Sequence, residues 1–228
     1  MIRCNANLYR ITSLCLSAKQ ARYCLNGVFV DPNPNGGVNL VATDSHRMLV
    51  IHDAAGTADE SAIIALTPES IKACKAGRNE TRHIEIKTGE NIATIYAVVG
   101  THESDDEMLA ARSHIAISAA CKIDGTFPDY RRVVPTPSPK GVATPFSGKY
   151  VADFGKAANE LAKIGSSNKY RKGIIRILCS DINSPALILF DNSPHALGVL
   201  MPIRGEGSHN LPAWFTGKPR PRRVKVLA

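Results

Sequence analysis

One order of elements recurs three times along this 228-residue chain: a strand, a helix, and then two or three further strands. The helices are expected to begin near residues 7, 67 and 149, because apolar side chains then recur at helical spacing. Leu8, Ile11 and Cys15 share one face of the first helix. Units that share a pattern without sharing a sequence predict a fold of class α+β, built from copies of one strand-helix-strands unit.

Local signals place the elements within each unit. Asn7 is a good N-cap for the first helix, and Thr67 followed by Pro68 is a strong helix start for the second. The third helix should bury Val151, Phe154, Ala158 and Leu161. Apolar or alternating runs predict strands at residues 2–5, 26–30, 38–43, 47–53, 62–66, 83–88, 91–99, 114–123, 174–180, 186–190 and 196–203.

Composition bounds the class of protein. Hydrophobic residues make up 44% and charged residues 21% of the chain, as in an ordinary soluble protein. No apolar run has the length that a bilayer requires, and the first residues lack a secretory signal, so a cytoplasmic location is expected. The six cysteines form no C-x-x-C pair and are expected to be small buried residues, with neither a metal nor a disulfide.

The net charge of +8 and a pI near 9.3 favour a polyanionic partner, nucleic acid above all. Half of that charge lies in residues 205–228, which hold five cations and one acid. Residues 19–24 (KQARYC) form a smaller basic cluster, which suits phosphate contact or an ordinary solvated helix exit. The tail also contains the aromatic stretch HNLPAWFTG, which would either anchor in a partner or pack back on its own domain.

A proline-rich run follows the motif GTFPDYRRVVP, which covers residues 125–135. Pro135, Pro137 and Pro139 favour an extended, semi-rigid connector, so a domain boundary is expected there. The motif would then lie at the start of a hinge between two domains, and a catalytic loop is less favoured there.

Asp44, Ser45 and His46 are the residue types of a hydrolase triad. Three consecutive residues cannot converge as a triad does, and G-x-S-x-G is absent. A polar turn or a ligand-lining turn explains them better. Glycine-rich phosphate loops and metal-ligand spacings are absent too, so neither an enzyme nor a cofactor is predicted.

Four stretches in one order resemble the beta sliding clamp of bacterial DNA polymerase III. They are RYCLNGVFV, VNLVATDSHRMLV, IDGTFPDYRRVVP and VLMPIR, where typical clamps read close to R-Y-x-L-N-G, A-T-D-G-H-R-L, F-P-D-Y-R-R-V-x-P and V-M-P-M-R. The resemblance covers roughly residues 1–204.

The resemblance implies repeats of the DNA-clamp fold with helices on one face and sheets outside. It implies a non-enzymatic processivity factor in DNA replication, which tethers a polymerase to duplex DNA without reading sequence. Expected partners are double-stranded DNA, a polymerase and further copies of the chain, with a clamp loader as a further candidate. Residues 1–134 resemble the family's middle domain, 135–145 a linker, and 146–204 half of its last domain, while 205–228 is a basic tail.

Family residues carry over to two sets of positions. The peptide-binding pocket would comprise Leu25, Thr43, Ser45, His46, Arg47, Met48, Pro128, Arg132, Val133, Val199, Leu200, Met201, Pro202, Ile203 and Arg204. DNA contacts would come from Lys19, Arg22, Tyr23, Lys72 and Lys75, with Arg220, Arg222 and Arg223 of the tail.

The chain also departs from the family pattern. It matches three repeat units where family chains have six, so it is expected to be a truncated member; four copies would restore twelve units. Ser45 stands where the family usually has glycine. These departures keep a rival hypothesis open, that of a peptide-binding adaptor or decoy that competes for clamp partners without encircling DNA. A hydrolase using Ser45 and His46 is a distant third.

Overall fold

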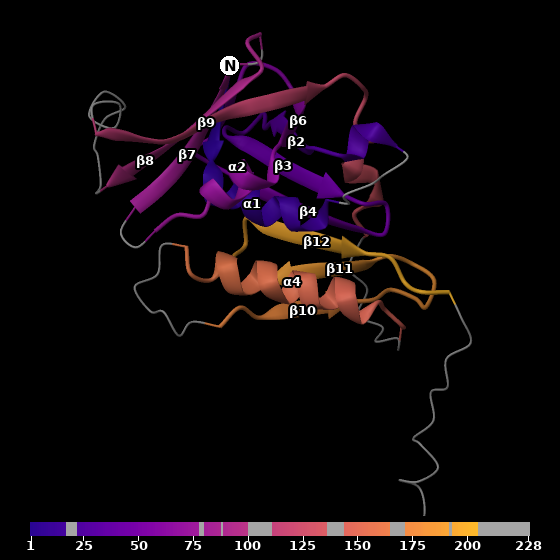
Figure 1. The fold of residues 1–228 in the computed structure, drawn as a ribbon. Helices are drawn as coiled ribbons and strands as arrows, with labels where there is room; N and C mark the ends of the chain where they lie inside the picture. The colour runs from indigo at the N-terminus through magenta and orange to yellow at the C-terminus, as the bar shows by residue number, and fades with distance from the viewer. Residues whose placement is uncertain are drawn as a thin grey trace, which may run out of the picture.

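The computed structural model describes residues 1–16, 22–77, 80–87, 89–99, 111–135, 144–164, 172–191 and 193–204. Figure 1 shows the elements. The described helices are α1 (Ala6–Thr12), α2 (Pro68–Ala73) and α4 (Gly148–Leu161), with 3-10 turns η1 (Ser13–Cys15), η2 (Tyr23–Leu25) and η3 (Tyr130–Val133). The described strands are β1 (Ile2–Asn5), β2 (Val28–Pro32), β3 (Val38–Thr43), β4 (Arg47–Asp53), β5 (Thr57–Ala58), β6 (Ala62–Leu66), β7 (Glu80–Lys87), β8 (Ile92–Val99), β9 (Arg112–Ile123), β10 (Ile175–Leu178), β11 (Ala186–Phe190) and β12 (Ala196–Leu200).

All twelve strands join one antiparallel sheet, in the order β10-β11-β12-β4-β3-β2-β6-β9-β8-β7-β1-β5. Strand β9 links its two halves, because residues 112–119 pair with β8 and residues 120–123 pair with β6. Helix α1 contacts β3 and β4 in one half and β1 and β7 in the other. The sheet therefore wraps around α1, and α4 lies beside that helix against β10 (Figure 1).

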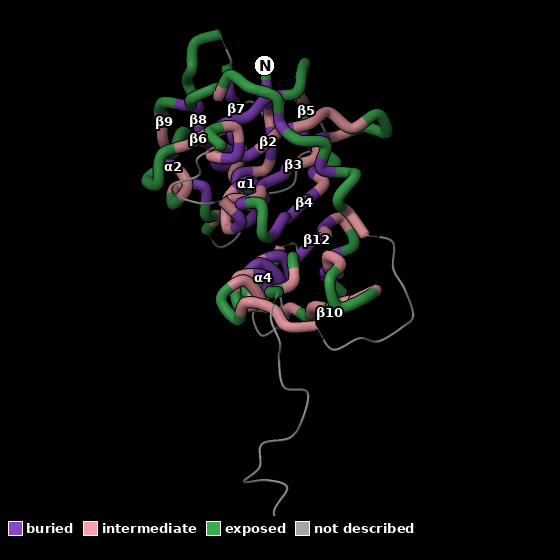
Figure 2. The backbone as a smooth tube through the Cα atoms, turned by 90° about the vertical axis from the view of Figure 1, so that its right-hand side faces the viewer, coloured by how far each residue is buried: buried purple, intermediate pink, exposed green. Residues whose placement is uncertain are grey.

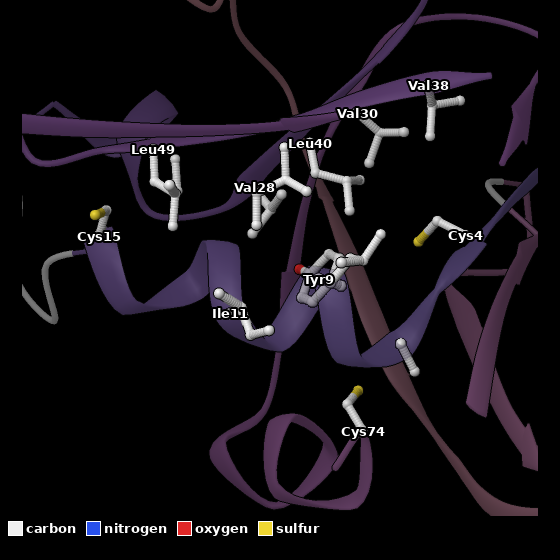
Figure 3. Packing of buried hydrophobic residues seen from close by; sticks show 14 of the residues in the cluster. Cys4, Tyr9, Ile11, Cys15, Val28, Val30, Val38, Leu40, Leu49 and Cys74 are labelled. Carbon is white, nitrogen blue, oxygen red and sulfur yellow. The ribbon is translucent and has the colours of Figure 1, made fainter. Parts of the chain in front are cut away.

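The main hydrophobic core fills the space around α1. Figure 3 shows Tyr9 and Ile11 of this helix beneath Val28, Leu40 and Leu49. The hydroxyl of Tyr9 is buried and donates to the carbonyl oxygen of Ile64 at 2.7 Å, so the polar tip of the ring is satisfied within the core. In Figure 2 the buried backbone concentrates in these central strands and in the helix faces that meet them.

The helix starts follow local capping chemistry. Thr67 caps α2 as predicted, since its Oγ1 accepts from the backbone N–H of Ser70 at 3.2 Å. The predicted N-cap of α1, Asn7, was wrong: Asn5 caps this helix, and its side chain accepts from the N–H groups of Asn7 and Leu8. Both asparagines suit the position, but β1 leads directly into α1, so the cap falls on the last residue of the strand.

The remaining sequence predictions differ from the structure at a few places. The strand predicted at residues 196–203 ends at Leu200, just before Met201 and Pro202, and the short β5 was missed. Cys4, Cys15 and Cys74 are buried as expected, but Cys121 is exposed on β9. Among the described residues, every helix is too short or too polar to cross a membrane.

The last unit continues the sheet of the first. Strand β12 pairs with β4, with Val199 opposite Met48 and Leu200 opposite Arg47. Leu40, Leu49 and Leu200 point into the core around α1, and we call this side the inner face. Because side chains alternate across a strand, Val41, Met48, Val50 and Val199 belong to the opposite side, the outer face, where a second apolar cluster covers them.

Candidate functional site

The loop between β3 and β4 is held in one conformation by its own side chains. Asp44 Oδ1 accepts from the backbone N–H groups of His46 and Arg47, both at 3.0 Å. Thr43 Oγ1 donates to the carbonyl of Arg47 at 2.7 Å and accepts from the N–H of Ser45. Ser45 adopts a φ of +72°, in the left-handed region that favours glycine. The turn thus keeps a glycine-like backbone although a serine occupies it.

Arg47 connects the loop between β3 and β4 to helix α4 of the last unit. Its buried guanidinium pairs with Asp44 at 3.1 Å and with Asp153 of α4, and it lies 4.6 Å over the ring of Tyr150. His46 stacks on the same tyrosine, with ring centroids 6.1 Å apart. Burial acts to lower the pKa of Arg47, but the hydrogen bond that it donates to Asp153 and the surrounding negative charge raise the pKa overall, so the guanidinium stays charged. Arg47 therefore positions the loop from the inner face.

The chain beyond β12 meets the same loop. The N–H of Met201 donates to the carbonyl of His46 at 2.8 Å, and the N–H of Ile203 donates to the carbonyl of Pro145 at 2.9 Å. Two of the four sequence motifs, 38–50 and 199–204, thus lie side by side although about 150 residues separate them.

The other two motifs cover the outer face of these strands. Leu25 of η2 and Phe127 and Tyr130 of the 125–135 segment form one buried cluster with Met48 and Val199. Phe127 stacks on Phe29 with ring centroids 4.6 Å apart. All four motifs therefore converge on one region, with apolar side chains packed between them.

Within the predicted peptide site, exposure separates supporting residues from available ones. Leu25, Met48 and Val199 are buried in the outer-face cluster, while Arg47 and Leu200 lie on the inner side. The exposed members are Ser45, His46, Pro128, Arg132, Val133, Met201, Ile203 and Arg204, with Thr43 and Pro202 half-buried. An apolar surface ringed by polar groups is the usual setting for a peptide contact.

The predicted DNA contacts are only partly described. Arg22 and Tyr23 are exposed at the start of η2, and Lys72 and Lys75 are exposed on and just after α2. Lys19 and the three tail arginines, Arg220, Arg222 and Arg223, lie outside the described residues.

A further basic face lies on α4 and was missed. Lys149, Lys156 and Lys163 are exposed and recur every seven residues, so they lie along one side of the helix and its last turn. The spacing is readable in the sequence. Lys149 lies in the first turn of the helix, where the helix dipole disfavours a cation, so the dipole does not account for its presence. Two carboxylates of α4 each pair with two cations: Asp153 pairs with Arg47 and Lys156, and Glu160 pairs with Arg10 and Lys163.

Two cavities open beside the second apolar cluster, and neither is lined by a residue of the predicted peptide site. One, of about 460 Å³, lies where η3 faces β3, β4 and β12. The other, of about 550 Å³, lies between β6, β9 and residues 124–127. Among the described residues, no group of three or more His, Cys, Asp or Glu side chains is arranged to hold a metal ion.

The sequence and the fold of this chain resemble those of known proteins. No family model matches the sequence. A beta sliding clamp from Proteus mirabilis is 28% identical over 166 residues, which cover 72% of this chain and 39% of that protein. In sequence, this chain is similar to the bacterial beta sliding clamps.

The fold agrees with that relationship. The sliding clamp of Pseudomonas aeruginosa superposes on 89% of this chain with a TM-score of 0.53 at 19% identity, and the match covers 65% of the clamp chain. A structure of the Pseudomonas aeruginosa clamp bound to griselimycin matches 90% of this chain with the same TM-score and 20% identity, again over 65% of its own length. This chain thus spans less than two thirds of the clamps that it matches.

Proposed function

We propose that this chain is a sliding-clamp-like processivity factor, which holds duplex DNA without sequence preference and retains a polymerase or other partner through a peptide site. The observation that carries the proposal is the pairing of β12 with β4, which unites all four clamp-like motifs in one region of a clamp-like fold. It would work in the cytoplasm as a homo-oligomer, without catalysis of its own.

The two activities would use opposite sides of the sheet. The exposed lysines of α4, with Lys72 and Lys75 at α2, lie on the helix-bearing side and suit phosphate contact. The peptide site would lie at the rim of the outer face, between Val133 of η3, the 43–48 loop and Met201. Arg47 links the two sides because it joins the loop to α4.

A second function depends on whether the edges of the sheet stay unpaired. The sheet ends in β10 and β5, and within the described part of the chain neither has a second strand neighbour. A chain that leaves these edges unpaired would be an adaptor that binds clamp partners and competes for them without encircling DNA.

The decisive experiment measures retention on DNA and peptide binding in the same preparation. The full chain is mixed with nicked circular DNA, and the retained fraction is compared before and after linearisation. Fluorescence anisotropy follows the binding of a Gln-Leu-Ser-Leu-Phe peptide, which has the Gln-Leu-x-Leu-Phe pattern that the resemblance to clamps implies for a partner. Retention on circles that is lost on linear DNA supports the clamp, whereas peptide binding without retention supports the adaptor. Failure of both measurements would overturn the proposed function.

A variant pair tests the proposed DNA face. Lys149→Gln with Lys156→Gln should lower the slope of log affinity against log salt by about 2, because each phosphate contact contributes about 0.9. The control, Lys87→Gln with Arg176→Gln, removes two exposed cations from β7 and β10 and should leave the slope unchanged. Equal slopes for both variants would remove α4 from the DNA site.

A further inference from the structure

The outer face also carries a cavity that none of the predicted peptide-site residues lines. The 460 Å³ cavity lies between η3 and the three strands β3, β4 and β12. Its walls combine apolar and polar groups: Asn39, Val50, His52, Tyr130, Arg131, Val134, Pro194, His195, Ala196 and Leu197. Two of these side chains, Arg131 and His195, can donate to an anionic group and no carboxylate is among the lining residues, so the cavity suits an anionic group with an apolar neighbour.

A hydrogen-bond chain orients one of the two imidazoles. The hydroxyl of Tyr130 donates to Asp31 at 2.9 Å and accepts from the Asn39 amide at 3.1 Å. The amide oxygen of Asn39 therefore faces His52, whose Nδ1 lies 3.1 Å away and donates to it. This arrangement leaves Nε2 of His52 as an acceptor for a backbone N–H of a bound chain.

The second imidazole and the arginine supply donors. His195 lies next to His52 across the β4–β12 seam, where the N–H of His52 donates to the His195 carbonyl at 2.7 Å. Burial and the proximity of His52 lower the pKa of His195, so at neutral pH its ring is uncharged and carries one N–H donor. Arg131 stands at the rim, more than half exposed, and uses one terminal nitrogen on Asp31. Its remaining N–H groups are available to a carboxylate.

The position of the cavity connects it with the proposed peptide site. His195 lies directly before β12 and precedes Val199 by four residues, which corresponds to about 14 Å of extended chain. η3 borders both places, since Arg131 and Val134 line the cavity while Arg132 and Val133 belong to the predicted peptide site. An extended peptide seated at the rim would reach the cavity with about four further residues.

We infer that this cavity is a second subsite for the partner peptide, which takes an acidic side chain placed about four or five residues from the apolar anchor. Arg131 and His195 would donate to the carboxylate, His52 would accept from the peptide backbone, and Val50, Val134 and Leu197 would contact the adjoining apolar residue. The inference rests on the proposed function, because it extends the peptide site of the clamp.

The test uses the full chain and a set of peptides. Each contains Gln-Leu-Ser-Leu-Phe and, after a Gly-Ser spacer, one Glu, Gln or Lys five residues from the anchor, on either its N-terminal or its C-terminal side. Affinities are measured by fluorescence anisotropy. For one of the two placements, N-terminal or C-terminal to the anchor, the Glu peptide should bind about five- to tenfold more tightly than its Gln counterpart. Long-range ¹H–¹⁵N spectra of the imidazoles should show shifts of His52 and His195 with the Glu peptide alone.

Charge reversal supplies the matched control. Arg131 and Arg176 are both exposed arginines paired with one aspartate of a neighbouring segment. Arg131→Glu should abolish the advantage of Glu and make the Lys peptide the tighter binder, whereas Arg176→Glu should leave the order of the peptides unchanged.

The outcomes separate the two proposals. Equal affinity of the Glu and Gln peptides from both sides, with the anchor still bound, overturns the second subsite and leaves the peptide site standing. An anchor that fails to bind, combined with shifts of His52 and His195 by the Glu peptide, keeps the acidic subsite and rejects the anchor site. Absence of both signals overturns both.

Discussion

Ser45 has a backbone conformation that is unusual for a serine. Its φ of +72° is the backbone state that glycine adopts freely and that other residues adopt at a cost. The hydrogen bonds of Asp44 and Thr43 keep the loop in this state. The loop is therefore maintained by its neighbours and not by the preference of residue 45 itself.

Ser45→Gly should accordingly stabilise the chain by about 0.5–1 kcal/mol, because relief of the left-handed strain exceeds the added entropy of the unfolded glycine. Urea unfolding of both proteins measures the difference. Ser45→Ala keeps the strained φ and provides the control, which should gain nothing. A glycine variant no more stable than the alanine variant would contradict this account.

Tyr130 gives a pH-dependent prediction at the same scale. Burial and the hydrogen bond to Asp31 raise its pKa from 10 to about 12. Since the folded chain holds the phenolic proton more tightly than the unfolded chain, this stabilisation is complete below pH 10 and is lost as the pH rises towards 12.

The measurement is the free energy of unfolding at pH 8, 10 and 11.5 for the original chain and Tyr130→Phe. The phenylalanine variant lacks both hydrogen bonds of the hydroxyl and should be the less stable protein at pH 8. The difference in the free energy of unfolding between the two proteins should narrow at pH 11.5. A gap that stays constant over this range would show that the Tyr130 hydroxyl does not titrate as described.

At the scale of elements, the close approach of α4 to β12 determines how the last unit packs. A Cβ atom added at Gly198 would lie 2.5 Å from Cε1 of Phe154 and 3.1 Å from Cβ of Ile188. Phe154 is buried in the main core, so its ring has little room to move away. Gly198 thus allows the helix to pack on the strand that carries Val199.

Gly198→Ala should destabilise the chain by about 1–3 kcal/mol through this overlap. Gly155→Ala offers a matched control on α4, because a Cβ there meets no atom within 4 Å. In that helix interior alanine should stabilise by up to about 1 kcal/mol. Thermal unfolding should therefore shift in opposite directions for the two variants, and shifts of the same sign would refute the packing argument.

At the scale of the whole molecule, the sheet's two ends bear on assembly. β10 and β5 end the strand order, and exposed strand edges readily pair with other chains. Copies joined edge to edge would continue the sheet from one chain to the next. The charge of the α4 face would then repeat around the assembly.

Light scattering behind a sizing column measures this directly. A closed assembly of four chains, the simplest way to restore twelve units, would have four times the chain mass of 24.5 kDa, or 98 kDa. A mass that stays at 24.5 kDa at micromolar concentration would argue against a ring and favour the adaptor. The mass should fall on substitution of Ile177 by proline, which removes a backbone N–H from β10.

Much of the fold follows from local sequence alone. Apolar runs at residues 62–66 and 47–53 predicted β6 and β4 with the observed ends, and Thr67-Pro68 placed the start of α2. These features depend on side-chain periodicity and capping, which act over a few residues. The four ordered motifs predicted the clamp relationship, and the lysine period of α4 was equally available although it was missed.

The tertiary structure decided how distant segments meet. Arg47 finds Asp153 at a separation of 106 residues, and His52 meets His195 because β12 joins β4 in a particular register. Nothing within a few residues of His52 or His195 specifies that neighbour, because strand pairing is set by the burial of whole faces. Sequence by itself thus determined the elements and the family resemblance. The ion pair of Arg47 with Asp153 on the inner face and the outer-face cavity arise only from the packing of the first unit against the last.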